Sequence, residues 1–170
     1  MKRTYIIAEI GINHQGDINI AKRLIDIAAA SGCDAVKFQK RNPDVCVPEE
    51  QKSKPRSWQG EDMTYLEYKH KIEFGKKEYD EIDLYCDEKG IKWFASVWDS
   101  DSVNFMSQYN DITKIPSALI TDKELPQYAR EKFDKLIIST GMSTEKEVES
   151  GIHSCSPDVI MHTNSAYPSP

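Results

Sequence analysis

Two apolar periodicities alternate along the chain. Compact apolar runs, typical of buried strands, are followed by stretches in which apolar residues recur every three or four positions, as on one face of a helix. The runs predict strands at residues 4–10, 34–39, 91–96, 111–115, 135–139 and 158–162.

Helices are expected between these strands, with start and stop signals at several ends. Asp17 is suited to cap the first turn of a helix, and a glycine often follows the last turn because it tolerates the left-handed conformation. Residues 121–124 have the spacing of a capping box, which predicts a helix start there. The other signals are a start at Ser143 or Thr144, stops at Gly32 and Gly90, and a short helix near 103–109.

This alternation determines the expected fold class. Strands too apolar for a one-sided sheet favour parallel strands joined by helical crossovers. The segment 11–16 lacks the glycine spacing of a dinucleotide-binding turn, which argues against a doubly wound sheet. We therefore predict an α/β fold of the (β/α)₈ TIM-barrel type, incomplete, with about six βα units present. Polar residues follow nearly every strand and are expected at one barrel mouth, where such folds build their sites: Glu9, Lys37, Gln39, Ser96, Lys114, Ser117, Ser139, Thr140, His162 and Asn164.

The segment from about residue 41 to 71 breaks the pattern. It is rich in proline and charged residues, which predicts a long loop with a short helix near residues 63–71. A surface insertion and a substrate lid both remain open for this loop.

Composition excludes some partners. The chain has 170 residues and a net charge of −6, with its basic residues interleaved among acidic ones, so no nucleic-acid or anionic-membrane face is expected. No apolar run approaches the roughly 20 residues that cross a bilayer, and no signal-peptide pattern is present, which predicts a cytoplasmic protein. The four cysteines show no zinc or redox spacing and are expected to be core thiols.

Two lysines, Lys37 and Lys114, stand within strands expected to be buried. Strand alternation places Lys37 and Gln39 on the lumen side, where an ammonium needs an anion to offset its desolvation. A phosphate or carboxylate of a substrate is one such partner, and an ion pair with Glu9 is the other. The two alternatives are equally compatible with the spacing. His14 and His162 lie in no short metal-ligand pattern, so no metal site built wholly within this chain is expected.

Five ordered segments carry a family resemblance: 8–14, 36–39, 114–117, 136–142 and 162–168. In this combination the sequence resembles the N-terminal barrel portion of the N-acetylneuraminate (sialic acid) synthase family. The resemblance implies a barrel enzyme that condenses phosphoenolpyruvate with an N-acetylated hexosamine, usually N-acetylmannosamine, to give a nonulosonic acid and phosphate. In that family C3 of phosphoenolpyruvate attacks the sugar aldehyde, a divalent metal, Mn or Mg, polarises the aldehyde, and water adds at C2.

The resemblance also implies roles for individual residues. Lys37, Lys114 and Ser117 match phosphoenolpyruvate-binding positions. Glu9, Gln39 and Tyr167 match sugar-side positions, with Glu9 also a candidate for acid/base work. Three departures modify the pattern: Val97 replaces a phosphate-contacting threonine, Leu119 replaces a glutamate, and Ser165 aligns with an asparagine. Ser96 is then the expected substitute for the threonine, and Asn164 or Ser165 is expected to take the asparagine's role.

Residues 1–170 are expected to form only the N-terminal part of a longer synthase. In the family the metal-binding histidines lie on later strands, and an antifreeze-like domain reaches across a homodimer. Two alternatives stay open. One is a sister synthase that makes legionaminic or pseudaminic acid, and the other is a non-catalytic remnant that binds a full-length synthase.

Overall fold

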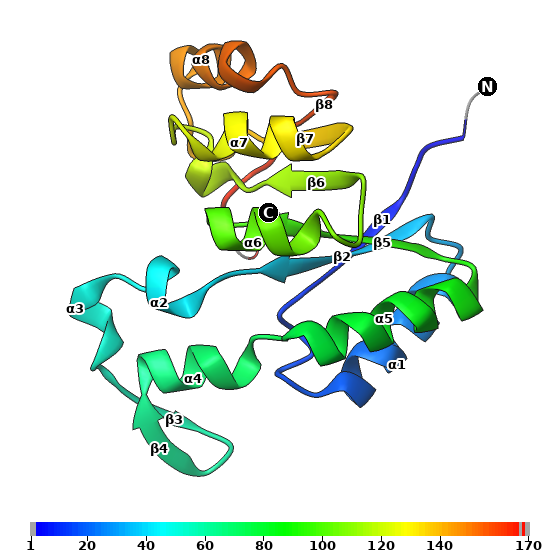
Figure 1. Ribbon diagram of the computed structural model, residues 1–170, viewed down its shortest axis with the longest axis vertical. Coiled ribbons are helices and arrows are strands. Elements are labelled where there is room, and N and C mark those ends of the chain that lie inside the picture. The colour runs from blue at the N-terminus through cyan, green and yellow to red at the C-terminus, as the bar shows by residue number, and fades with distance from the viewer. Residues whose placement is uncertain (1–2, 167, 169–170) are drawn as a thin grey trace. The chain divides into compact units, whose positions relative to one another are not determined.

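The computed structural model describes residues 3–166 and 168, which form two compact units, Met1–Phe94 and Ala95–Pro170 (Figure 1). The strands are β1 (Ile7–Gly11), β2 (Ala35–Lys40), β3 (Pro55–Trp58), β4 (Glu61–Thr64), β5 (Lys92–Val97), β6 (Ile112–Ile115), β7 (Lys135–Ser139) and β8 (Val159–Met161). The helices are α1 (Ile18–Ala30), α2 (Pro43–Cys46), α3 (Glu49–Lys52), α4 (Tyr65–Ile72), α5 (Lys76–Lys89), α6 (Ser100–Met106), α7 (Leu125–Lys132) and α8 (Glu145–Cys155), with a 3-10 turn at Ser117–Leu119.

The N-terminal unit is built on β1, β2 and the start of β5. Strands β1 and β2 pair in parallel, and helices α1 and α5 pack against each other (Figure 1). Phe38, Tyr79 and Ile82 are fully buried, and the Tyr79 ring stacks on Trp93 with centroids 5.6 Å apart. Burial of these large side chains is the main stabilising contribution to this unit.

The C-terminal unit is built on the end of β5 and on β6, β7 and β8, which pair in parallel in that order. The helices α6, α7 and α8 follow the strands in turn, and α7 packs against both of the others. The buried Thr113 hydroxyl of β6 donates to the carbonyl oxygen of Ala95 at 2.9 Å, which satisfies a polar group inside the apolar layer.

The strand order supports the predicted fold class. In each unit successive large-sheet strands are neighbours, with the order β1-β2-β5 in the first and β5-β6-β7-β8 in the second. A doubly wound sheet would reverse its order at a switch point, whereas a (β/α)₈ barrel adds each strand beside the previous one. The described residues therefore have the topology of an incomplete (β/α)₈ barrel.

Most predicted helix ends are confirmed. Asp17 accepts a hydrogen bond from the backbone N–H of Asn19, Gly90 is left-handed at the end of α5, and Thr144 forms a capping box with Glu147 at the start of α8.

The predicted capping box at residues 121–124 is wrong. Helix α7 begins at Leu125, and the Asp122 carboxylate accepts from the backbone N–H groups of Glu124 and Leu125. The reason is Pro126, which is tolerated in the first turn of a helix but would clash with a preceding carbonyl if the helix started four residues earlier.

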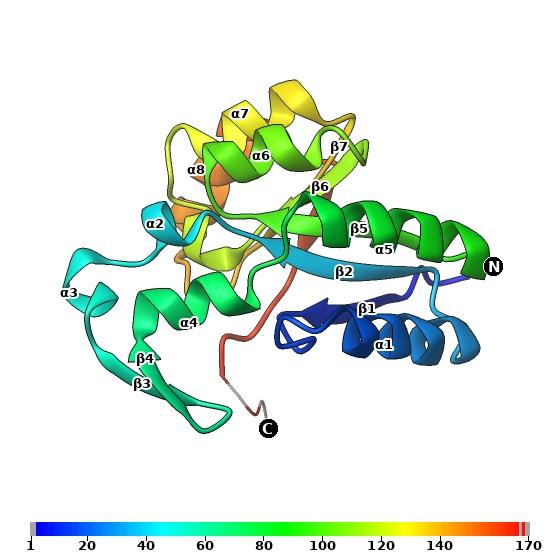
Figure 2. The ribbon, with the colours of Figure 1, turned by 60° about the horizontal axis from the view of Figure 1, so that its bottom comes forward.

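The segment between β2 and α5 is more ordered than a long loop. It contains α2, α3, a two-stranded antiparallel hairpin of β3 and β4, and α4, which lies where the short helix was expected (Figure 2). The hairpin was not predicted. Its two turn residues, Gln59 and Gly60, both have positive φ, as a type I′ turn requires, and glutamine rarely signals that conformation. None of the described helices combines the length and apolarity needed to cross a membrane.

Gly16 allows the turn after β1 to approach the end of α4 closely. Its φ is +78°, and a Cβ there would overlap the carbonyl oxygen of Lys71 and lie 3.2 Å from Cα of Ile72. We expect Gly16→Ala to lower the free energy of unfolding by about 3 kcal/mol, because backbone strain and overpacking add. Gly32→Ala is the matched control, since Gly32 has a φ of +76° with nothing within 4 Å. Urea unfolding measures both variants. An equal loss of unfolding free energy in the two would contradict the close approach of Gly16 to the end of α4.

Candidate active site

Glu9 and Lys37 are register partners in the middle of β1 and β2. The Lys37 Nζ lies 2.5 Å from Glu9 Oε2, with the lysine side chain 8% exposed and that of Glu9 49% exposed. Burial lowers the pKa of Lys37, and the Glu9 carboxylate opposes that shift. The ion pair considered from the sequence is therefore formed, with its cation buried and part of its anion open to solvent.

Gln39 joins Glu9 above the backbone of Gly11. A Cβ on Gly11 would lie 2.9 Å from Glu9 Oε1 and 3.1 Å from Gln39 Nε2, so both polar groups converge on this glycine. Gly11 has a φ of +54°, and the β1–β2 register shifts between Glu9 and Gly11. Such irregularities at a strand end redirect side chains and are frequent beside active sites.

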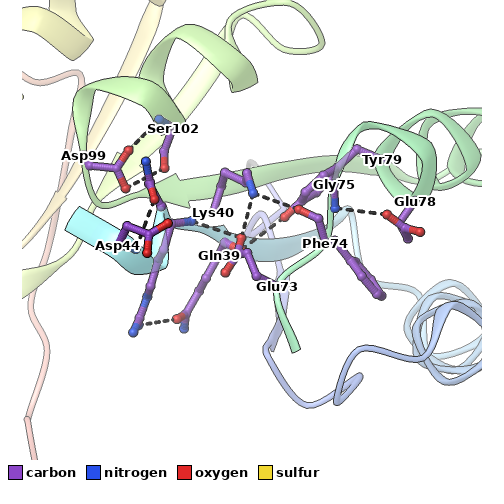
Figure 3. Close-up of polar contacts among 12 residues, drawn as sticks. Gln39, Lys40, Asp44, Glu73, Phe74, Gly75, Glu78, Tyr79, Asp99 and Ser102 are labelled. Carbon is purple, nitrogen blue, oxygen red and sulfur yellow. Dashed lines mark hydrogen bonds and ion pairs between the residues drawn. The ribbon is translucent and has the colours of Figure 1, made fainter. Parts of the chain in front are cut away.

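A second polar group secures the end of β2. Lys40 donates to Glu73 Oε1 at 3.0 Å and to the carbonyl oxygen of Phe74 at 2.8 Å, and the Tyr79 hydroxyl donates to the carbonyl oxygen of Gln39 at 3.1 Å (Figure 3). Burial raises the pKa of Glu73, while Lys40 opposes the shift. These contacts fix the backbone at the end of β2, and therefore Gln39, against α5 and against residues 73–74, which precede α5.

His14 is a packing residue of the N-terminal unit. Its ring stacks on Phe74 with centroids 3.8 Å apart, its Nδ1 accepts from the backbone N–H of Gly16, and it is 1% exposed. Burial lowers its pKa from 6.5 to about 4. His14 is therefore held in the core by ring stacking and by one hydrogen bond.

The depressed pKa of His14 predicts a pH-dependent stability. The unfolded chain binds this proton near pH 6.5 and the folded chain only near pH 4, so the stabilisation present above pH 6.5 is lost as the pH falls through that window. The loss amounts to roughly 3 kcal/mol between the two values. In unfolding curves at pH 7 and pH 4.5, His14→Gln should flatten this dependence, whereas the exposed-site control His153→Gln should retain it.

The C-terminal unit gathers hydroxyl groups around Gly141. The Gly141 N–H points at Ser117 Oγ, 3.0 Å away, and at Thr163 Oγ1, 2.9 Å away, and these two hydroxyls lie 3.1 Å apart. A Cβ on Gly141 would overlap Ser165 Oγ. Serine and threonine hydroxyls together with a backbone N–H are groups that bind phosphate oxygens.

The remaining phosphoenolpyruvate-side candidates lie on neighbouring elements of this unit. Ser96 and Lys114 are register partners on β5 and β6, with Ser96 2% exposed and Lys114 half-buried. Asn164 is exposed and accepts from the backbone N–H of Ala166 at 3.2 Å. Tyr167, expected on the sugar side, lies outside the described residues.

Two members of this cluster of hydroxyls around Gly141 were not predicted from the sequence. Gly141 and Thr163 have central positions in it, yet a glycine after a strand and a threonine near a strand end are common and carry little signal. Ser139, two residues before Gly141, is 2% exposed, and its Oγ has no hydrogen-bond partner among the residues that the structure describes.

A divalent metal is implied by the family resemblance, but the described side chains do not fit one. Within residues 3–166 and 168, no three or more His, Cys, Asp or Glu side chains gather in a way that could hold a metal ion. His14 is packed against Phe74, and His162 is exposed.

Comparisons with known proteins show which family the chain resembles. Residues 24–170 match the model of the NeuB family. The chain is 33% identical to the N,N'-diacetyllegionaminic acid synthase of Campylobacter jejuni, over 100% of the chain and 54% of that protein. It is 34% identical to human N-acetylneuraminate-9-phosphate synthase, over 96% of the chain and 47% of that protein.

A solved structure extends the comparison to the fold. The N-acetylneuraminic acid (sialic acid) synthetase from Leptospira borgpetersenii, in complex with citrate, matches 99% of this chain and 57% of its own chain, with a TM-score of 0.86 and 29% sequence identity. The chain spans about half the length of the curated relatives it matches. The chain belongs to the NeuB family and corresponds to the N-terminal portion of sialic-acid-type synthases.

Proposed function

We propose that the protein condenses phosphoenolpyruvate with an N-acetylated hexosamine to give a nonulosonic acid and phosphate. The observation that carries the proposal is the buried ammonium of Lys37 on β2, which forms an ion pair with Glu9 on β1. A buried lysine on a strand of a barrel-type fold is suited to bind an anionic substrate group. Membership of a family whose relatives include sialic-acid-type synthases supports the same assignment.

The residues proposed for phosphoenolpyruvate offer two kinds of hydrogen-bond donor. Lys37 and Lys114 offer positive charge, and the hydroxyls around Gly141 offer neutral hydrogen-bonding groups. Carboxylate and phosphate oxygens accept from both kinds of donor, and charged donors form the stronger bonds. The proposed residues are Lys37, Ser96, Lys114, Ser117, Asn164 and Ser165.

The sugar side is assigned to Glu9, Gln39 and Tyr167. In the proposed reaction C3 of phosphoenolpyruvate forms a bond to the aldehyde carbon, the aldehyde oxygen gains a proton to become a hydroxyl, water adds at C2, and phosphate leaves. The partly exposed carboxylate of Glu9 is placed to exchange a proton with a sugar hydroxyl or with the aldehyde oxygen. The proposal further includes a homodimer that works in the cytoplasm with a Mn or Mg ion, although no described residue is assigned to that ion.

Carbon counting gives the set of sugars that the proposal must compare. Three carbons come from phosphoenolpyruvate, so C6 of a hexose becomes C9 of the product, and a 9-phosphate product requires a hexose 6-phosphate. The relatives are named for products with and without a phosphate. N-acetylmannosamine, its 6-phosphate, and the diacetamido hexoses that lead to legionaminic or pseudaminic acid are therefore the substrates to compare.

The test is a condensation assay with the purified full-length gene product, because residues 1–170 cover only about half the length of the relatives and their activity alone is not part of the proposal. Phosphoenolpyruvate carrying ¹⁸O in its bridging position is incubated with each sugar and with added Mn or Mg. We expect one sugar to give a nonulosonic acid by mass spectrometry, with the label recovered in the released phosphate because the C–O bond breaks. Absence of product with all the sugars, from protein shown to be folded by circular dichroism, would overturn the proposal and leave the non-catalytic remnant.

A further inference from the structure

Arg41 contacts the side chain of Gln39 from the position just after β2. An Nη of Arg41 donates to Gln39 Oε1 at 2.8 Å, and the Arg41 backbone N–H donates to Glu73 Oε1 at 3.1 Å. The arginine is half-buried. Glu73 also accepts a hydrogen bond from the Lys40 ammonium, so the Glu73 carboxylate anchors two successive residues, Lys40 and Arg41.

The chemistry of this contact determines which way the Gln39 amide faces. A guanidinium has only donors, so the amide atom that faces Arg41 must be the oxygen. The amide nitrogen then lies on the opposite side, 3.1 Å from the position of a Cβ on Gly11, where Glu9 Oε1 is also within 2.9 Å. The result is a hydrogen-bond donor from Gln39 and an acceptor from Glu9 at the same place.

Arg41 keeps its charge in this environment. Burial lowers its pKa, while the nearby Glu73 carboxylate opposes the shift. Because an arginine side chain ordinarily titrates far above neutral pH, the guanidinium remains a donor. A charged donor holds the Gln39 oxygen more firmly than a neutral one would.

We propose that Arg41 is a positioning residue of the sugar site, which holds the Gln39 amide so that its nitrogen faces Glu9. This inference rests on the proposed function, because it assigns the Gln39–Glu9 pair to the sugar. A donor beside an acceptor complements an acetamido or hydroxyl group, each of which offers both an acceptor oxygen and a proton. Without Arg41 the amide is free to turn, and a turned amide places its oxygen beside the Glu9 carboxylate, where two acceptors repel.

The kinetic test compares Arg41→Met with Arg41→Lys. We expect Arg41→Met to raise KM for the accepted sugar about tenfold, because the Gln39 amide no longer presents its nitrogen and one hydrogen bond to the sugar is lost, with KM for phosphoenolpyruvate changed by less than about twofold. Arg41→Lys should recover part of the loss, because an ammonium also donates to the amide oxygen. The matched control is Arg56→Met in the hairpin, where the arginine lies over the Tyr68 ring, and it should leave both constants unchanged.

A double-mutant cycle separates positioning from direct contact. If Arg41 acts through Gln39, Arg41→Met should have little further effect on sugar KM in a Gln39→Met background. Additive losses, or an equal rise in the two KM values, would overturn the inference.

A readout without catalysis separates this inference from the proposed function. The side-chain amide of Gln39 in ¹⁵N-labelled protein should show one fixed pair of proton signals with a nuclear Overhauser contact to Gly11, and Arg41→Met should shift the signals and remove the contact. An unchanged amide spectrum overturns the inference alone. An inactive wild-type protein overturns the proposed function, and with it the role at a sugar.

Discussion

Lys37→Met is expected to lower kcat/KM for phosphoenolpyruvate by about 10³-fold, because it removes a preorganised buried charge from the proposed anion site. Methionine is close to lysine in length and apolar, so it fills the space of the lysine side chain on β2. The former partner, Glu9, is half-exposed and remains solvated after the change. We therefore expect the variant to fold, with the loss confined to substrate binding and turnover.

The matched control for this variant is Lys76→Met. Lys76 also forms an ion pair, with Asp80 at 2.7 Å, but its side chain is 69% exposed on α5. An exposed pair of this kind contributes little, so kcat/KM should change by less than about twofold. Steady-state kinetics of both variants measures these effects. A fall in kcat/KM of less than about fivefold for Lys37→Met would exclude the Lys37 ammonium from the reaction.

Gly141→Ala is expected to raise KM for phosphoenolpyruvate by about 10²-fold. The new methyl group would overlap Ser165 Oγ and lie 3.0 Å from Thr163 Oγ1 and 3.1 Å from Ser117 Oγ. These hydroxyls must move apart, which removes two or three hydrogen bonds to a charged ligand at about 1.5–3 kcal/mol each, partly compensated by rearrangement. The clash involves the ends of side chains, so the loss of stability should stay near 1–2 kcal/mol.

The control for Gly141→Ala is Gly75→Ala, because Gly75 also has an ordinary φ and the nearest atom to its Cβ position is Glu78 Oε2 at 3.5 Å. It should leave KM unchanged. An unchanged KM for Gly141→Ala, measured together with the melting temperature, would show that the cluster of hydroxyls around Gly141 does not bind phosphoenolpyruvate.

The sequence predicted the strands and most helices because each depends on a local pattern. Apolar periodicity and single capping residues such as Asp17 and Thr144 act within one turn or one strand. The wrong start of α7 came from reading the capping spacing without the constraint imposed by Pro126. The β3–β4 hairpin escaped prediction because Gln59 adopts a positive φ that its side chain does not favour.

The candidate site was predictable to a smaller extent. The proximity of Glu9 and Lys37 follows from strand alternation, because parallel strands place equivalent positions side by side. The group around Gly141 was not predictable in this way. It joins Ser117 and Thr163, which are 46 residues apart in sequence, through a backbone N–H that leaves no mark on the side-chain pattern.

The orientation of Gln39 shows the same limit. Its position on β2 could be deduced from alternation, but the direction of its amide depends on Arg41, whose own placement depends on Glu73 from a distant part of the chain. Long-range contacts of this kind determine which atom a polar side chain presents, and so they determine recognition.

A crystal structure of the protein soaked with phosphoenolpyruvate tests the central claim most directly. The account predicts a carboxylate or phosphate oxygen of the ligand within about 3.2 Å of Lys37 Nζ, the range of a charge-assisted hydrogen bond. Ligand bound at another place, with Lys37 still paired to Glu9 and no ligand oxygen near its ammonium, would contradict the account.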